Sequence, residues 1–330
     1  MEYFGPTVFE LGEIEALKRA VAVFKGVPST LVGSGDDAAV ISVPSEKFVV
    51  TTDTLVQDHD FKLEFSSGFD LGYKAVASNL SDVVAMGAKP IALTVAMVIT
   101  KDTNQAWLEH FAQGLQSALD ELAPTAEIVG GDLAAGNQIV IAVAAHGELI
   151  GEPVLRSGAQ VGDQLAVCGT LGKAAAGLAM LQHADLTLAK SYPELVEVQL
   201  RPKPPLDYAL QAVGTAHSMM DISDSLALDA SRLARASGVS LRIASAALFG
   251  YQAVLEQAAQ SIASRDGSEV SELDWVLFGG EDHGFLATFA PDQKLPIGFK
   301  RIGEVISKYD HDVLLDDKPL PPRGWDSVRD

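Results

Sequence analysis

Residues 69–87 read FDLGYKAVASNLSDVVAMG, and residues 90–99 read PIALTVAMVI. The first segment is helix-like, and the second is an apolar run of the kind that forms a buried strand. The same pattern extends to strand-like runs at 38–43, 47–53 and 138–149 and a helical run at 104–122. The order strand–strand–helix–strand–helix–strand predicts an α/β protein whose N-terminal part is an α+β layer rather than a strict parallel alternation.

A polar, glycine-containing stretch, EPVLRSGAQVGD at residues 152–163, interrupts this pattern and predicts a domain boundary. The length of 330 residues is itself typical of two domains. We therefore expect an N-terminal domain over residues 1–151 and a C-terminal α/β domain over residues 152–330. Near the start of the chain, residues 9–24 have apolar residues at helical spacing and predict one amphipathic helix.

Composition and charge restrict the kinds of partner. Hydrophobic residues make up 48% of the chain, which is typical of a well-packed protein and not of a disordered one. The formal net charge, 24 − 44 = −20, argues against nucleic acid or an anionic membrane as the main partner. A phosphorylated small molecule stays possible if divalent cations mediate the contact. The N-terminus has no signal-peptide pattern, no apolar run reaches transmembrane length, and the single cysteine, Cys168, lies in a strand-like run. These features predict a cytoplasmic protein in which Cys168 is a buried small hydrophobe.

Aspartates recur beside glycine, serine or threonine at the ends of apolar runs. A single aspartate of this kind is more often a solvated turn or capping residue than a ligand. Six occurrences in both halves of the chain favour a shared function, because Mg²⁺ takes oxygen ligands and binds carboxylates together with substrate phosphates. Glycine beside the acid also lets a phosphate approach backbone N–H groups. The six segments are GDD (35–37), TTD (51–53), NLSD (79–82), GGD (130–132), MDISD (220–224) and GGED (279–282).

The six segments together indicate a site for metal ions and nucleotide phosphates, on a scaffold other than the common ones. The sequence has no GxxxxGK[ST] loop, no protein-kinase glycine loop with its HRD and DFG partners, and no GxGxxG fingerprint. Its seven histidines do not cluster at zinc-binding spacing. Asp221 and Asp224 are three residues apart, so they would share one face if a helix begins there.

An ordered series of motifs resembles the thiamine-monophosphate kinase family, which belongs to the aminoimidazole-ribonucleotide synthetase-like ATP-binding superfamily. The series covers nearly the whole chain, from about residue 10 to the C-terminal GWD. The early motifs mark the superfamily, whereas GGED and the RSG at residues 156–158 favour the kinase within it. The motifs are GDDAAV, TTDTLV, NLSDVVAMGAKP, GGD, LRSGAQVGD, GTLGKAAAGL, RPKPP, MDISDSLALD and WVLFGGEDH.

The resemblance implies ATP-dependent phosphorylation of thiamine monophosphate to thiamine diphosphate by direct in-line transfer. It implies ATP and several Mg²⁺ ions as cofactors, and it leaves open whether K⁺ is also required. The implied fold has two α/β domains. In this implied fold, the N-terminal sheets of two subunits would pair in a homodimer, and the nucleotide would lie at the domain and subunit junction.

Site residues follow by matching each family position to this sequence. The implied metal ligands are Asp37, Asp53, Asp82, Asp132, Asp221 and Asp224, with Thr51 and Thr52 as further oxygen donors. Among them, we expect Asp53, Asp132 and Asp224 to act most directly in the transfer. The implied ATP contacts are Gly131, Arg156 and Ser223, and the implied substrate residues are His59 or Asp60, Glu281 and Trp325. A solvated arginine at 156 and a tryptophan that only closes the last fold element are the alternatives at those two positions.

Several positions depart from the common family pattern. The order His59-Asp60-Phe61 shifts the histidine, GGD is followed by Leu-Ala-Ala, and GGED is followed by His283-Gly. All the ligand acids are retained, so these departures concern the substrate positions and not the phosphate chemistry. The alternatives are another enzyme of the superfamily, such as the ribonucleotide synthetase, selenophosphate synthetase or the hydrogenase-maturation carbamoyl dehydratase, or a non-catalytic ATP- and metal-binding regulator. The reactive cysteine or selenocysteine expected of the second enzyme and the C-terminal cysteine expected of the third are both lacking here.

Overall fold

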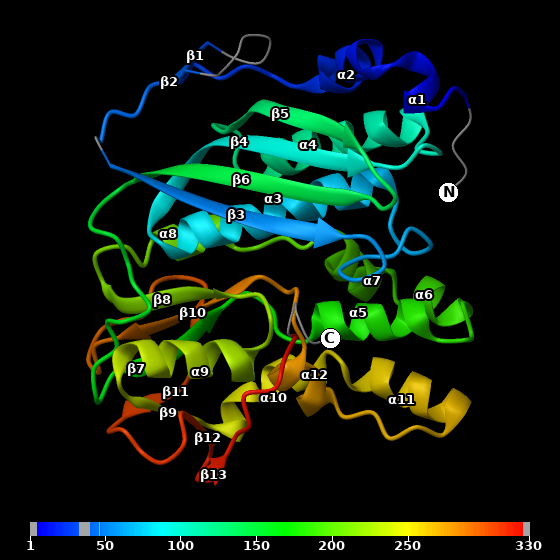
Figure 1. The fold of residues 1–330 in the computed structure, drawn as a ribbon. Coiled ribbons are helices and arrows are strands. Elements are labelled where there is room, and N and C mark those ends of the chain that lie inside the picture. Colours follow the sequence, from blue (N-terminus) through cyan, green and yellow to red (C-terminus); the bar gives the residue numbers. More distant parts are fainter. Residues whose placement is uncertain (1–4, 33–39, 46, 326–330) are drawn as a thin grey trace. The chain divides into compact units, whose positions relative to one another are not determined.

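The computed structural model describes residues 5–32, 40–45 and 47–325, and Figure 1 shows their helices and strands. They form two compact units. Unit 1 comprises Met1–Val83 and Ala88–Leu149, and unit 2 comprises Val84–Gly87 and Ile150–Asp330. The mixed α/β class predicted from the sequence is confirmed, whereas the boundary at residues 151 and 152 stays a prediction.

Unit 1 is built on a four-stranded sheet with the order β3-β6-β4-β5. Neighbouring strands are antiparallel except β4 and β5, which are parallel and joined by a helix. The strands are β3 (Phe48–Val56), β4 (Ala88–Ile99), β5 (Glu127–Ala135) and β6 (Val140–Leu149), with a separate pair β1 (Thr30–Val32) and β2 (Val40–Ile41). Strand β5 was not among the predicted runs, because two glycines and an aspartate interrupt its apolar pattern.

Two long helices, α3 (Gly68–Ala85) and α4 (Gln105–Leu122), cover one face of this sheet (Figure 1). Both match the helical runs predicted from the sequence. Side chains beneath them, such as Val143 and Ala145, are 1% and 0% exposed. The two helices approach closely at Gly72, where a Cβ would lie 2.1 Å from the carbonyl oxygen of Phe111. A larger residue at this position would force the helices apart.

The predicted helix at residues 9–24 is wrong as a single element. The chain forms α1 (Val8–Leu11), α2 (Glu13–Ala20) and a 3₁₀ turn, η1 (Val21–Val23). Gly12 separates the first two, with φ 77° and ψ 157°. This conformation lies outside the helical region, and its positive φ favours glycine. Thr7 and Glu10 form a reciprocal capping box that starts α1.

Unit 2 contains a seven-stranded sheet with the order β13-β12-β9-β11-β7-β10-β8. All its pairings are antiparallel except β12 with β9. The strands are β7 (Gln164–Cys168), β8 (Ala216–Ile222), β9 (Ser240–Ile243), β10 (Gly284–Phe289), β11 (Phe299–Ile306), β12 (Val313–Leu315) and β13 (Lys318–Pro319). The helices are α5 (Lys173–Gln182), α6 (Thr187–Ser191), α7 (Pro193–Leu200), α8 (Leu206–Leu210), α9 (Leu226–Ser237), η2 (Ser245–Leu248), α10 (Phe249–Ala253), α11 (Glu256–Asp266) and α12 (Glu272–Phe278).

One large apolar core holds unit 2 together, with Leu165, Met180, Leu233 and Leu286 all fully buried. Cys168 ends the buried strand β7 and is free. Burial raises the pKa of the Cys168 thiol to about 12. Among the described residues, no helix has both the length and the apolar character that crossing a membrane requires.

Substituting Gly72 by alanine tests the α3–α4 crossing. We expect Gly72→Ala to lower the unfolding temperature by about 4–8 °C, because overpacking costs on the order of 2 kcal/mol. Gly250→Ala is the matched control, since a Cβ there meets nothing within 4 Å. Calorimetry should find the control within about 2 °C of the parent protein. Equal losses in both variants would contradict the close approach.

The environment of Cys168 predicts its reactivity. A raised pKa leaves little thiolate at pH 8, and burial blocks the reagent. The native thiol should therefore react with a disulfide reagent at least about 1,000-fold more slowly than the urea-unfolded thiol. Absorbance of the released thiolate measures both rates, and similar rates would show that Cys168 is accessible.

Candidate active site

Strand β3 carries three of the predicted site residues on alternating faces. Thr51 and Asp53 lie on the face covered by α3, and Thr52 lies on the opposite face. The Thr51 hydroxyl donates a hydrogen bond of 3.1 Å to Asp82 on α3, so two predicted ligands are in contact. The hydroxyl of Thr52 donates instead to the carbonyl oxygen of Val143, at 2.9 Å.

Asp132 lies elsewhere on the same sheet. It is within strand β5, not at the end of an apolar run as the sequence pattern predicted. The register aligns Asp132 with Ala96, Ala142 and Thr54, which places it on the face opposite to Asp53. Because β3 and β5 are three strand spacings apart, their backbones are separated by about 14 Å. Asp53 and Asp132 therefore do not meet within one unit.

The glycine before Asp132 has a packing reason. A Cβ at Gly131 would lie 2.2 Å from the carbonyl oxygen of Val95 on the neighbouring strand β4. A side chain at position 131 would therefore collide with the neighbouring strand. Both Gly131 and Asp132 are exposed. This leaves open backbone beside a carboxylate, which is the arrangement that the sequence pattern suggested for phosphate.

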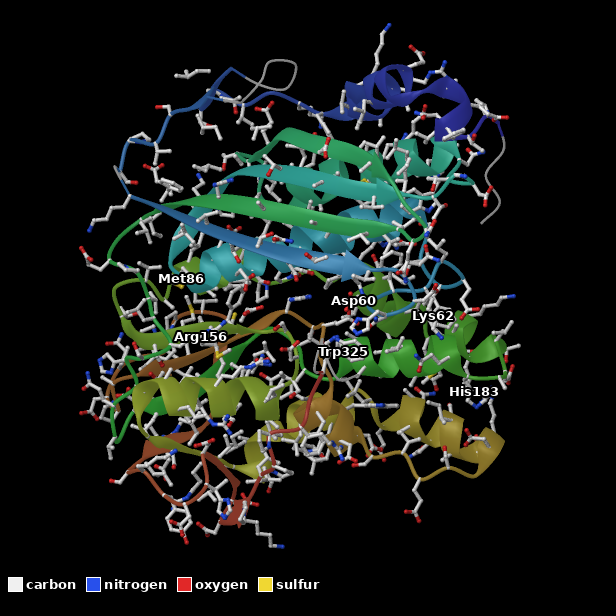
Figure 2. The ribbon with its side chains drawn as sticks, in the orientation of Figure 1. Asp60, Lys62, Met86, Arg156, His183 and Trp325 are labelled. Carbon is white, nitrogen blue, oxygen red and sulfur yellow. The ribbon has the colours of Figure 1, made fainter. Side chains whose placement is uncertain are left out.

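His59 and Asp60 lie in the loop after β3, and Figure 2 labels Asp60 there. The two side chains are joined at 2.9 Å, from the imidazole Nδ1 to a carboxylate oxygen. The other oxygen of Asp60 accepts a hydrogen bond of 2.8 Å from the backbone N–H of Val56. The structure therefore makes a pair of the two residues that the sequence presented as alternatives.

In unit 2, the structure brings three predicted segments together. The backbone N–H of Glu281 donates to the carbonyl oxygen of Ser223 at 2.8 Å, and the N–H of Trp325 donates to the carbonyl oxygen of Asp224 at 3.1 Å. Figure 2 shows Trp325 on the C-terminal segment that reaches this region. The turn at 220–224, the turn at 279–282 and the GW of the tail are thus neighbours, although up to 105 residues separate them, since 325 − 220 = 105.

Asp221 and Asp224 do not share a helix face. Asp221 is the buried sixth residue of strand β8, 4% exposed, and Asp224 lies in the bend that precedes α9. The imidazole Nδ1 of His283 is 3.8 Å from a carboxylate oxygen of Asp221. The helical spacing considered for this pair is wrong, because the strand continues through Ile222.

Two further residues belong to this corner, and no role was predicted for either from the sequence. The fully buried Asp229 accepts hydrogen bonds from the backbone N–H groups of Asp224 and Ser225, at 3.0 and 3.2 Å. Arg232 bridges the carboxylates of Asp224 and Asp229, with 2.6 Å to the latter. Burial raises the pKa of Asp229 to about 6, and the charges of Asp221 and Asp224 act in the same direction. The only sequence signal for Asp229 and Arg232 was their position, about one and two turns into the helix that follows Ser223-Asp224.

Arg156 lies in the loop that precedes β7 (Figure 2). Its side chain is exposed, and its carbonyl oxygen accepts a hydrogen bond of 2.7 Å from Ser237. A Cβ at Gly158 would lie 1.7 Å from the carbonyl oxygen of His217, so the RSG segment lies against the start of β8. The backbone is fixed while the guanidinium is free to meet a ligand.

Asp37 and its neighbour Asp36 lie outside the described residues. Among the residues that are described, no group of three or more histidine, cysteine or acidic side chains is arranged to hold a metal ion. The contacts among predicted ligands include that of Thr51 with Asp82 in unit 1, and in unit 2 Arg232 joins the predicted ligand Asp224 to Asp229.

Comparison with known proteins identifies the family to which this fold belongs. The family model for the AIR synthase related protein, N-terminal domain, matches residues 35–149. The matched residues include all four strands of the β3–β6–β4–β5 sheet.

Similarity over the full length is more specific. A thiamine-monophosphate kinase of Mycobacterium tuberculosis is 38% identical over 98% of this chain and 93% of its own. The crystal structure of the enzyme from Stenotrophomonas maltophilia has a TM-score of 0.76, with 31% identity over 92% of this chain and 95% of that one. The structure described as AaThiL complexed with AMPPCP and TMP has a TM-score of 0.74, with 30% identity over 98% and 99%. The chain belongs to the thiamine-monophosphate kinase family.

The corner around Arg232 leads to a prediction about stability. Arg232→Gln would leave the carboxylates of Asp221, Asp224 and Asp229 without this cation. We expect the unfolding temperature to fall by about 4–8 °C in a chelator, which corresponds to about 2 kcal/mol, and by less than half as much in millimolar Mg²⁺. Calorimetry in the two buffers measures the difference.

The control for Arg232 is Arg235→Gln on the same helix. Arg235 pairs with Asp312, which is not a predicted ligand. Its loss should be the same with and without Mg²⁺. If Mg²⁺ failed to restore the Arg232 variant selectively, these carboxylates would not form a cation site.

Proposed function

We propose that this chain transfers the γ-phosphoryl group of ATP directly to thiamine monophosphate, giving thiamine diphosphate and ADP. The observation that carries the proposal is the convergence of residues 220–224, 279–282 and 324–325 in a chain similar to thiamine-monophosphate kinases over 98% of its length. Phosphoryl transfer needs little covalent chemistry from the protein, so positioned charges and donors suffice.

The donor set fits Mg²⁺. Its members are carboxylate and hydroxyl oxygens, with no thiolate and no clustered imidazoles that would favour a softer metal. The contact of Thr51 with Asp82 already joins two such donors. When bound, Mg²⁺ would neutralise phosphate charge. The residues that would hold it are Asp37, Thr51, Thr52, Asp53, Asp82, Asp132, Asp221 and Asp224, and a K⁺ requirement is a matter for measurement.

The remaining roles divide between nucleotide and substrate. Arg156 would contact phosphate oxygens through its exposed guanidinium, while Gly131 and Ser223 would contact ATP. Glu281 would face the cationic ring system of thiamine, and Trp325 would offer an aromatic surface to it. The His59–Asp60 pair would act together at the substrate. The catalytic acids proposed are Asp53, Asp132 and Asp224.

We further propose a homodimer in which the open faces of the two N-terminal sheets pair. That face carries Phe48 and Val50, which are 58% and 61% exposed. Asp132 is on it, whereas Asp53 is on the covered face, so the two acids would serve different parts of the assembled site. In this proposal residues 1–151 bind ATP and Mg²⁺ and dimerise, residues 152–330 form the C-terminal domain, and the protein acts in the cytoplasm.

The assay that tests the function uses purified protein, Mg-ATP and thiamine monophosphate. Thiamine diphosphate and ADP should form in equal amounts, and ADP should not form without thiamine monophosphate. ADP formation that ignores thiamine monophosphate would favour another enzyme of the superfamily. ATP binding without any product would favour a regulator.

Substitution of one acid tests the proposed ligand set. Asp53→Asn should lower kcat by about 100-fold or more, because a neutral amide no longer offers a charged ligand. The control is Asp310→Asn, at an exposed loop position, which should retain full activity. Circular dichroism should be unchanged in both. Near-normal turnover by Asp53→Asn would refute the assignment of that residue.

A further inference from the structure

The turn that carries Glu281 has an unusual backbone. Glu281 has φ 67° and His283 has φ 50°, although neither is glycine or asparagine. The left-handed region costs roughly 1 kcal/mol or more for such residues, so neighbouring contacts must hold this conformation in place. Asp282 is the residue between them.

The carboxylate of Asp282 is buried against the start of helix α5. The hydroxyl of Thr170 donates to one oxygen at 2.6 Å, and the backbone N–H of Ala174 donates to the other at 3.2 Å. The backbone N–H groups of Gly172 and Lys173 also lie near this carboxylate. The N-cap residue of α5 is Gly172, which has no side chain to cap the helix. Asp282 therefore caps a helix that begins more than 100 residues earlier in the chain.

The two neighbours of Asp282 reach two other elements. Glu281 accepts a hydrogen bond of 2.5 Å from Gln199 on α7, and α7 is held close to α5 at Gly177, where a Cβ would lie 2.1 Å from the carbonyl oxygen of Leu195. His283 approaches Asp221, as described above. Three consecutive side chains thus connect the turn to α7, α5 and β8.

We propose that Asp282 is a positioning residue: by anchoring the turn to the N-terminus of α5, it holds the Glu281 carboxylate where thiamine monophosphate binds. This inference rests on the proposed function, because the substrate role of Glu281 does. Without the anchor, the turn would relax from its left-handed conformation and Glu281 would shift relative to Gln199. The side chain of Asp282 itself is 5% exposed and does not need to touch the substrate.

The test compares the KM values of the two substrates. Asp282→Ala should raise the KM for thiamine monophosphate about 10-fold or more and change the KM for ATP less than twofold. Asp282→Asn keeps one acceptor oxygen and should fall between the parent protein and the alanine variant. Calorimetric titration of thiamine monophosphate without ATP should show the same order of affinities.

Two more variants keep the test decisive if Asp282→Ala does not fold. Thr170→Val removes one donor to Asp282 and leaves the turn itself intact, and it should raise the same KM by a smaller factor. Asp185→Ala is the control, because Asp185 also accepts a backbone N–H near a helix start, that of Thr187, but lies on the surface. It should leave both KM values unchanged.

The outcomes separate this inference from the proposed function. A parent protein without thiamine-monophosphate kinase activity would overturn both. An active parent protein whose Asp282 and Thr170 variants lose stability but keep both KM values, or raise both equally, would overturn the positioning role alone.

Discussion

The hydrogen bond from the backbone N–H of Glu281 to the carbonyl oxygen of Ser223 is the contact on which the proposed site in unit 2 depends. It joins the turn that would offer a substrate carboxylate, in Glu281, to the turn that would offer metal and nucleotide contacts in the proposed site. Gly280 makes this approach possible, because a Cβ there would lie 2.5 Å from the same carbonyl oxygen. Gly280 of the GGED segment is therefore needed for the close packing of these two chain segments, whether or not a ligand binds there.

Charge is the second constraint. Asp221, Asp224 and the buried Asp229 repel one another, and Arg232 offsets this repulsion in the protein alone. An arginine shared between the two carboxylates holds them close together, and in the proposed site it would leave them negative enough to attract a cation. In unit 1 the hydroxyl of Thr51 provides a neutral contact to Asp82 instead.

The sequence was sufficient for the α/β class, for helices α3 and α4, for strands β3, β4 and β6, and for the family. These elements have regular apolar periodicity or ordered motifs. It was insufficient where tertiary contacts decide the outcome. Gly12 divides a helix that periodicity alone joins, Gly131 and Asp132 continue a strand that looks like a turn, and Asp221 stays in a strand. Arg232 and Asp282 act through partners that are distant in the sequence or on another helix turn, so local patterns do not reveal them.

Direct transfer between the two substrates is tested most directly by the configuration at phosphorus. ATP made chiral at its γ-phosphorus with oxygen isotopes would be incubated with the protein, Mg²⁺ and thiamine monophosphate, and the β-phosphorus of the product analysed. A single in-line displacement predicts inversion. Retention would indicate two displacements through a phosphorylated enzyme and would contradict the proposed use of these acids as positioned ligands.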